Sequence, residues 1–412
     1  MQRRALVVTL LASLLSLSTS VLATDLALVG GKVYPSPIDP PIENATILIH
    51  NGQIVAVGSG ARVKAPRLAR TVTIVNCKGM VVTAGFWNSH VHFTEDAWKD
   101  AGTGDVAKLE EHMQKMLTEW GFTSVFDTAS FVTNTNALRT RVNKNELPGP
   151  RILTVGEPLY PKDGIPVYVG PEWHIPQAAS VEDAQRMAQE RLAHGADGIK
   201  VFAGAILKGG VVLPMDVEII RAAVKVAHAA GKPVFAHPSN HAGTDNALAG
   251  GVDVLAHTIP MEPAFTPAEL AQMKSQHVAL IPTLSLFPDE ERKFGGSKED
   301  EEAVVKTAIS QLKSYFDVGG TILFGTDVGY TQLYDTTSEF QYMSESGMSA
   351  RDILASLTTN PANFFKIRNS GTVAKGMDAD LVVLTGDPAS DPRNFAKVSL
   401  TIRSGRIIYK RH

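Results

Sequence analysis

The sequence predicts an α/β protein in which a (β/α)8 TIM barrel is joined to a small composite β-sandwich domain built from both termini. Two observations favour this fold class. Through the middle of the chain, short runs of apolar and β-branched residues alternate with helical stretches, which is typical of a barrel of parallel strands. Near both ends the helical stretches disappear, and short apolar runs separated by turn residues indicate antiparallel strands.

The first 23 residues have the pattern of a secretory signal peptide. Arg3 and Arg4 precede an apolar run over residues 5–17, and Val21 and Ala23 form a small-residue cleavage pattern. The apolar run is short for a bilayer-spanning helix. The mature chain is therefore expected to be periplasmic or secreted from a bacterium, without a membrane anchor once the signal peptide is cleaved.

The predicted β domain combines residues 24–82 with residues 370–412. Asn51 and Gly52 separate ATILIH from QIVAVG, which is a strong signal for a two-residue hairpin. At the other end of the chain, ADLVVL, VSLTI and RIIYK have the pattern of three further strands. Two sets of short strands at opposite ends of a chain indicate one domain assembled from both.

The predicted barrel covers residues 83–369 and takes its first strand from the segment that enters it. Its eight strands are expected at 81–90, 124–127, 151–155, 198–202, 234–237, 252–257, 279–283 and 321–325. Helices are expected between most of them, for example at 181–193, 215–230 and 267–275. The charged run DEERKFGGSKEDEE is expected to begin a solvated helix.

Side chains able to hold a metal fall at the carboxyl ends of five predicted strands, where a barrel concentrates its chemistry. The first strand ends in NSHVH, and alternation along a strand points both of its histidines to one side. Alone, a histidine there is more often a core residue, and an aspartate more often a helix cap. Together they predict a metal site, formed by His90, His92, Lys200, His237, His257 and Asp327.

Lys200 is the most informative member of this set, because lysine is rarely buried and its ammonium group cannot ligate a cation. A neutral lysine could react with carbon dioxide to give N6-carboxylysine, whose two oxygens can bridge two metals. The alternative interpretation is a buried lysine paired with Asp327.

These residues and the motifs around them resemble the amidohydrolase superfamily, close to its imidazolonepropionase-like and Xaa-Pro dipeptidase (prolidase-like) branch. The motifs extend across essentially the whole mature chain: GFWNSHVH, GADGIKVF, PVFAH, VDVLAH, FGTD, TTNPANFF and GTVAKGMDADLVVLTGDP. The resemblance implies two divalent ions, with zinc as the expected metal. His90, His92 and Asp327 would hold one ion, His237 and His257 the other, and carboxylated Lys200 would bridge them.

The same resemblance implies roles for water and for Asp327. A hydroxide between the two ions would attack a scissile carbonyl, and Asp327 would carry the proton to the leaving nitrogen. Both Lys200 and Asp327 are therefore expected to be essential to catalysis. The expected enzyme is a metal-dependent amidohydrolase, a hydrolase of carbon–nitrogen bonds, acting on a small-molecule amide, an N-acyl amino acid or a dipeptide.

At three places this sequence differs from motifs of related enzymes, and these differences narrow the set of expected activities. Deaminases of the superfamily have a glutamate three residues after the strand-five histidine, where this chain has Asn240. Hydantoinases and dihydroorotases often have an arginine at the position of Thr94. The loop VGYTQLYDTTSEF after Asp327 differs from that of prolidase-like relatives, so deamination is disfavoured and dipeptide specificity stays open.

Two alternatives remain beside amide hydrolysis. The same metal site could act on an ester, a lactone or a carbamate, and a catalytically silent binding protein could share the fold, although such proteins typically lose ligands. Aromatic loops suit a partly apolar substrate, and the predicted contacts are Tyr168, His174, His241 and Tyr330.

The net charge of the chain and its distribution along the sequence indicate which partners to expect. A net charge of -3 without a basic run in the mature region argues against nucleic acid. A small-molecule substrate is the expected partner, and a homo-oligomer stays open.

Overall fold

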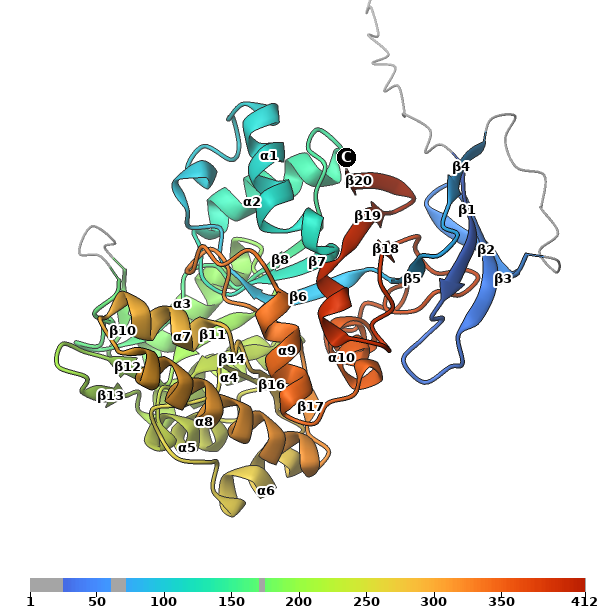
Figure 1. Ribbon diagram of the computed structural model, residues 1–412. Coiled ribbons are helices and arrows are strands. Elements are labelled where there is room, and N and C mark those ends of the chain that lie inside the picture. The colour runs from blue at the N-terminus through green and yellow to red at the C-terminus, as the bar shows by residue number, and fades with distance from the viewer. Residues whose placement is uncertain (1–24, 61–71, 170–174, 412) are drawn as a thin grey trace, which may run out of the picture.

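The computed structural model describes residues 25–60, 72–169 and 175–411. The barrel and the terminal β strands lie side by side, with helices around the barrel (Figure 1). The predicted signal peptide lies outside the described residues, and so does His174. None of the helices in the described ranges combines the length and apolarity needed to cross a bilayer.

Parallel strands close into the predicted (β/α)8 barrel. Two sheets, β6-β7-β8 and β11-β14-β15-β16-β17, supply its wall. Backbone hydrogen bonds join the two sheets. On one side Leu159 N donates to Lys200 O (2.8 Å), and on the other Ser89 N donates to Phe324 O (2.7 Å). The barrel strands are β6 (Phe86–Val91), β7 (Phe122–Asp127), β8 (Arg151–Thr154), β11 (Ile199–Phe202), β14 (Val234–His237), β15 (Val254–Ala256), β16 (Ala279–Ile281) and β17 (Thr321–Ile322).

Several helices begin at a local capping signal. The predictions at 181–193 and 267–275 are confirmed to the residue by α3 and α6, and α6 starts with a capping box between Thr266 and Glu269. The helices are α1 (Val106–Met116), α2 (Val132–Asn143), α3 (Val181–Ala193), α4 (Val217–Ala229), α5 (His241–Gly250), α6 (Pro267–Ser275), α7 (Leu286–Lys293), α8 (Lys298–Asp317), α9 (Thr337–Glu345), α10 (Ala350–Leu357) and α11 (Thr359–Phe364).

The loops contain three short 3-10 turns and two small strand pairs in the described residues. The 3-10 turns are η1 (Asp96–Trp98), η2 (Thr118–Trp120) and η3 (Pro392–Ala396). Two small strand pairs lie near the mouth of the barrel: β9 (Tyr160–Pro161) with β10 (Gln177–Ala178), and β12 (Gly204–Ile206) with β13 (Val212–Pro214).

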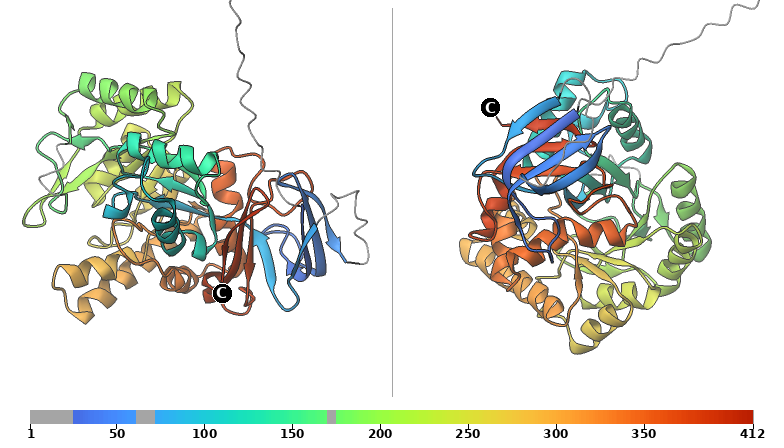
Figure 2. Two further views of the ribbon diagram at one scale, coloured as in Figure 1. Left: turned by 90° about the horizontal axis from the view of Figure 1, so that it is seen from above. Right: turned by 90° about the vertical axis from the view of Figure 1, so that its right-hand side faces the viewer.

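Strands from both ends of the chain form one eight-stranded sheet, in the order β20-β19-β18-β5-β1-β2-β3 with β4 beside β1. Its two ends fold over each other, because Leu28 and Ile47 share one buried apolar cluster with Val383 and Ile402. Figure 2 shows the two layers in its right-hand view. The strands are β1 (Asp25–Val33), β2 (Ile42–His50), β3 (Gln53–Ser59), β4 (Val72–Asn76), β5 (Val81–Ala84), β18 (Leu381–Leu384), β19 (Val398–Arg403) and β20 (Arg406–Lys410).

The prediction of one strand over 81–90 was wrong. The structure divides this segment between β5, in the terminal sheet, and β6, in the barrel. Gly85 joins the two, and a Cβ atom added there would lie 2.1 Å from Thr123 Oγ1. Only glycine lets the chain pass this close to β7.

Candidate functional site

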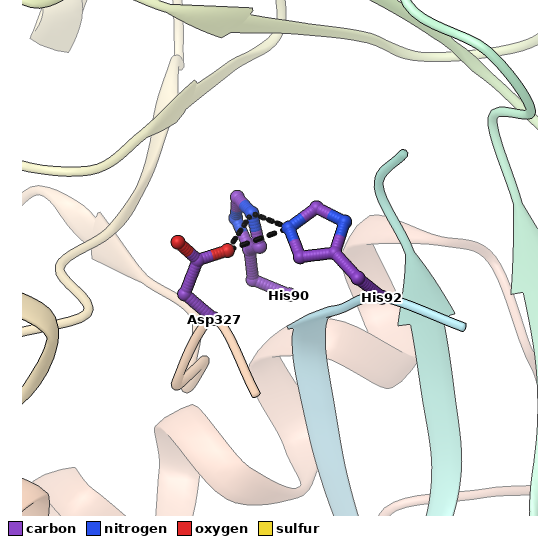
Figure 3. A group of neighbouring side chains, drawn as sticks. All are labelled: His90, His92 and Asp327. Atoms are coloured by element: carbon purple, nitrogen blue, oxygen red, sulfur yellow. Dashed lines mark hydrogen bonds and ion pairs between the residues drawn. The ribbon is translucent and has the colours of Figure 1, made fainter. Parts of the chain in front are cut away.

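Two histidines and an aspartate converge at the carboxyl end of the barrel (Figure 3). His90 and His92 come from the end of β6, and Asp327 follows β17. Asp327 Oδ1 lies 2.8 Å from His90 Nε2 and 2.6 Å from His92 Nε2, and the two ring nitrogens are 3.2 Å apart. Among the described residues, this is the one group of three or more potential metal ligands.

The charges of this group depend on burial and on each other. Burial raises the pKa of Asp327, but the neighbouring His90 and His92 outweigh it and hold that pKa well below its usual range. Burial, together with the charge of Lys200, lowers the pKa of His90 to about 3. An ionised carboxylate thus faces a neutral imidazole, and these are the forms that ligate metals.

His237 and His257 lie beside this group. The His257 ring centroid is 4.5 Å from that of His90 and 4.8 Å from that of His237. Burial lowers the pKa of both side chains well below the usual value, so both are neutral. His257 Nδ1 lies 2.8 Å from Thr283 Oγ1, and a hydrogen bond there orients the ring and leaves Nε2 for the site.

Lys200 completes the predicted set. Its side chain is buried, with Nζ 3.4 Å from His90 Nε2. Burial lowers its pKa to about 8, against the opposing pull of Asp327 and Asp127. Within the described ranges Lys200 makes no ion pair, so the alternative of a lysine paired with Asp327 is not supported. All six predicted ligands therefore lie at one end of the barrel.

A cavity of about 210 Å³ opens over this set. Tyr168 and Tyr330, two predicted substrate contacts, both line it, with ring centroids 5.4 Å apart. A second cavity of about 80 Å³ lies beside it, under Met261 and Phe287. The site can therefore hold a ligand with aromatic contacts on more than one side.

His241 was predicted in a loop that faces the substrate, and this placement was wrong. It is the first residue of α5, which Asn240 caps by accepting a hydrogen bond from Gly243 N at 2.8 Å. Its Nδ1 lies 2.7 Å from Glu269 Oε1, and it lines neither cavity.

Glu290 was missed because its segment was interpreted as solvated. It lies on α7, lines the second cavity and accepts a hydrogen bond from Tyr330 Oη at 2.9 Å. Burial raises its pKa to about 7. A signal was available, since Leu286 and Glu290 are four residues apart and share one face of a helix.

Comparison with known proteins gives a family and several structural relatives. Residues 81–408 match the model of the Amidohydrolase family. A Xaa-Pro dipeptidase with bound methionine has a TM-score of 0.79 and 21% identity, covering 94% of this chain and 100% of that one. A. niger ochratoxinase has a TM-score of 0.75 and 21% identity, and the match covers 94% of this chain and 96% of that one. At these identities the structural likeness establishes the fold alone, and no curated protein matches the chain.

Proposed function

Because the chain belongs to the amidohydrolase family, we propose that it is a secreted, binuclear, metal-dependent hydrolase that cleaves an amide bond. The observation that carries this proposal is the convergence of His90, His92 and Asp327 beside His237, His257 and Lys200. The substrate is a small-molecule amide, an N-acyl amino acid or a dipeptide. The signal pattern in residues 1–23 supports a periplasmic or secreted location.

The residues present fit a pair of divalent ions. Imidazole nitrogens and carboxylate oxygens are the ligands that zinc takes in proteins. Three such atoms already point at one another, namely His90 Nε2, His92 Nε2 and Asp327 Oδ1. The pKa of Lys200, lowered to about 8, leaves a usable neutral fraction for carbamate formation. Two ions held by these groups would polarise the scissile carbonyl and make water a nucleophile near neutral pH.

The remaining steps belong to the chain's own residues. Asp327 accepts the proton of the attacking water and delivers it to the leaving nitrogen, which is the double role of a general base and acid. His92 is held in place for this by its Nδ1, 2.9 Å from Ala129 O. Tyr168 and Tyr330 form walls that hold the substrate over the site.

Hydrolases are among the structural relatives, which supports hydrolysis as the reaction. They include a Xaa-Pro dipeptidase, an ochratoxinase and a molinate hydrolase. The prolidase-like branch is therefore the proposed branch for this chain. Activity on an ester, a lactone or a carbamate would use the same residues, and side-by-side assays of these bonds decide between them.

Elemental analysis tests the metal centre. Protein purified with zinc and bicarbonate should hold about two ions per chain. Lys200→Ala should lose metal and activity, short carboxylic acids should restore part of both, and Lys200→Arg should stay inactive because guanidinium cannot form a carbamate. Lys306→Ala, on an exposed part of α8, is the matched control. One ion per chain at most, or full activity in Lys200→Ala, would contradict the binuclear site.

A further inference from the structure

The two cavities meet at the metal-site residues. His237, His257 and Asp327 line both of them, and so does Tyr168. A bond placed over these residues would have room on two sides, about 210 Å³ on one and about 80 Å³ on the other. The two halves of an amide can therefore occupy separate spaces.

Among the described residues that line the two cavities, cations are scarce and anions are not. Lys200 is the one lysine or arginine of these linings, whereas Glu157 lines the larger cavity and Glu290 and Glu291 line the smaller. Lys200 is also the residue that carbamate formation would turn into an anion.

Two cations lie nearby, but both are already paired. Arg191 Nε lies 3.1 Å from Glu157 Oε2, and Lys293 Nζ lies 2.7 Å from Asp289 Oδ2. Lys293 comes within 5.5 Å of the Tyr330 ring centroid, yet it lines neither cavity. Within the described ranges, no lysine or arginine other than Lys200 lines either cavity to receive a carboxylate from a substrate.

Most of the remaining lining residues are apolar or aromatic, and some of them extend to the surface. Phe131, in the larger cavity, is 47% exposed, and Met261, in the smaller, is 74% exposed. Ile206 and Phe287 add further apolar surface to the smaller cavity. Burying an uncharged group against these apolar side chains is favourable, whereas burying an anion against them costs solvation energy.

The pKa of Glu290 indicates that a negative charge is unfavourable in the smaller cavity. The carboxyl group of Glu290 accepts a hydrogen bond from Tyr330 Oη, and burial still raises its pKa to about 7. A substrate carboxylate in the smaller cavity would face the carboxyl group of Glu290 as a like charge, which costs binding energy.

We propose that this site hydrolyses amides in which both halves are uncharged, one half in the larger aromatic cavity and the other in the smaller cavity beside Glu290. A substrate carboxylate in the smaller cavity is disfavoured by the like charge of Glu290. The inference rests on the proposed amide hydrolysis and narrows its substrate class. Neutral N-substituted amides replace N-acyl amino acids and dipeptides as the expected substrates.

Matched substrate pairs test this on the zinc-loaded enzyme at pH 8. N-benzoylglycine and N-isobutylbenzamide share an acyl group and nearly the same shape, and differ in one negative charge; the phenylacetyl versions form a second pair. Release of benzoate or phenylacetate should give a kcat/KM at least about 100-fold higher for the neutral member. Equal rates, or a preference for the carboxylate, would overturn the inference and leave amide hydrolysis standing. Cleavage of neither member of any pair would overturn both proposals.

Glu290→Gln locates the source of the selectivity. Glutamine can still accept the hydrogen bond from Tyr330 but carries no charge, so the preference for the neutral member should shrink at least about fivefold. Glu299→Gln, an exposed position on α8, makes the same change of charge away from both cavities and should leave the preference unchanged. If the two variants behave alike, the assignment of one half of the substrate to the cavity beside Glu290 is wrong.

Discussion

The buried side chains at the mouth of the barrel are ionisable, such as Lys200 and Asp327, whereas those deeper in the barrel are aromatic or aliphatic, such as Phe126 and Phe235. Exposure does not separate the two regions, since Lys200 is 2% exposed and Asp327 4%, against 1% for Phe126. Their chemistry does. Burying ionisable groups opposes folding unless each is paired, while burying rings favours it.

The two regions also differ in backbone conformation. At the mouth, His257 and Asp327 have φ values of 91° and 63°, a region that side-chain-bearing residues rarely adopt. Deeper in the barrel, the Phe126 ring packs 4.7 Å from Phe235 and 4.9 Å from Phe365, which follows α11. The mouth is therefore arranged for chemistry at a cost in stability, and the apolar layer beneath it offsets that cost.

The largest expected effect is on catalysis at the mouth, from Asp327→Asn. The change keeps size and shape but removes the charge and the basic oxygen. Turnover should fall about 10²–10⁴-fold, the usual contribution of a general acid–base group. Turnover, metal content and thermal melting are measured on one preparation, with Asp317→Asn, an exposed site at the end of α8, as the control. An Asp327→Asn enzyme that keeps its metals and works within a few-fold of wild type would show that another group carries the proton.

The apolar layer is tested by Phe126→Ala, which should act on stability. Removing a buried ring leaves a cavity, and such changes cost about 3–5 kcal/mol of unfolding free energy. Phe294→Ala removes the same side chain where it is 67% exposed and should change stability by no more than about 0.5 kcal/mol. Urea denaturation measures both. Equal losses in the two variants would mean that the deeper layer does not carry the stability assigned to it.

Features that depend on local sequence could be predicted, whereas features that depend on contacts between distant segments could not. The six mouth residues could be found because each lies within or just after a predicted strand, and the carboxyl end of a strand is a local feature of the pattern. The break at Gly85 could not, because its cause is a contact with Thr123 on another strand. Glu290 was hidden in a charged run, since only the packing of α7 decides which of those charges turns inward. His241 could have been placed in α5, because Asn240 is a local capping signal.

The smallest expected effect is a pH dependence of stability that arises from one buried carboxyl group packed against the loop after β16. Glu339, on α9, is buried and accepts hydrogen bonds from Leu284 N at 2.9 Å and from Ser285 N at 2.7 Å, in the loop after β16. Burial raises its pKa from 4.5 to about 7, although these hydrogen bonds oppose the shift. Between these two pH values the folded protein keeps a proton that the unfolded chain releases, so this contribution to stability is full below pH 4.5 and is lost as pH rises through 7.

The loss amounts to about 3 kcal/mol at most. Glu339→Gln cannot titrate, so the stability difference between wild type and variant should shift against the wild type by up to that amount from pH 5 to pH 8. Urea denaturation of both proteins in one zinc-containing buffer measures this difference at each pH. Glu302→Gln, at an exposed position on α8, should give a difference that does not depend on pH. A flat difference for Glu339→Gln as well would mean that its carboxyl group stays ionised in the folded protein, and that the hydrogen bonds from the loop after β16 outweigh its burial.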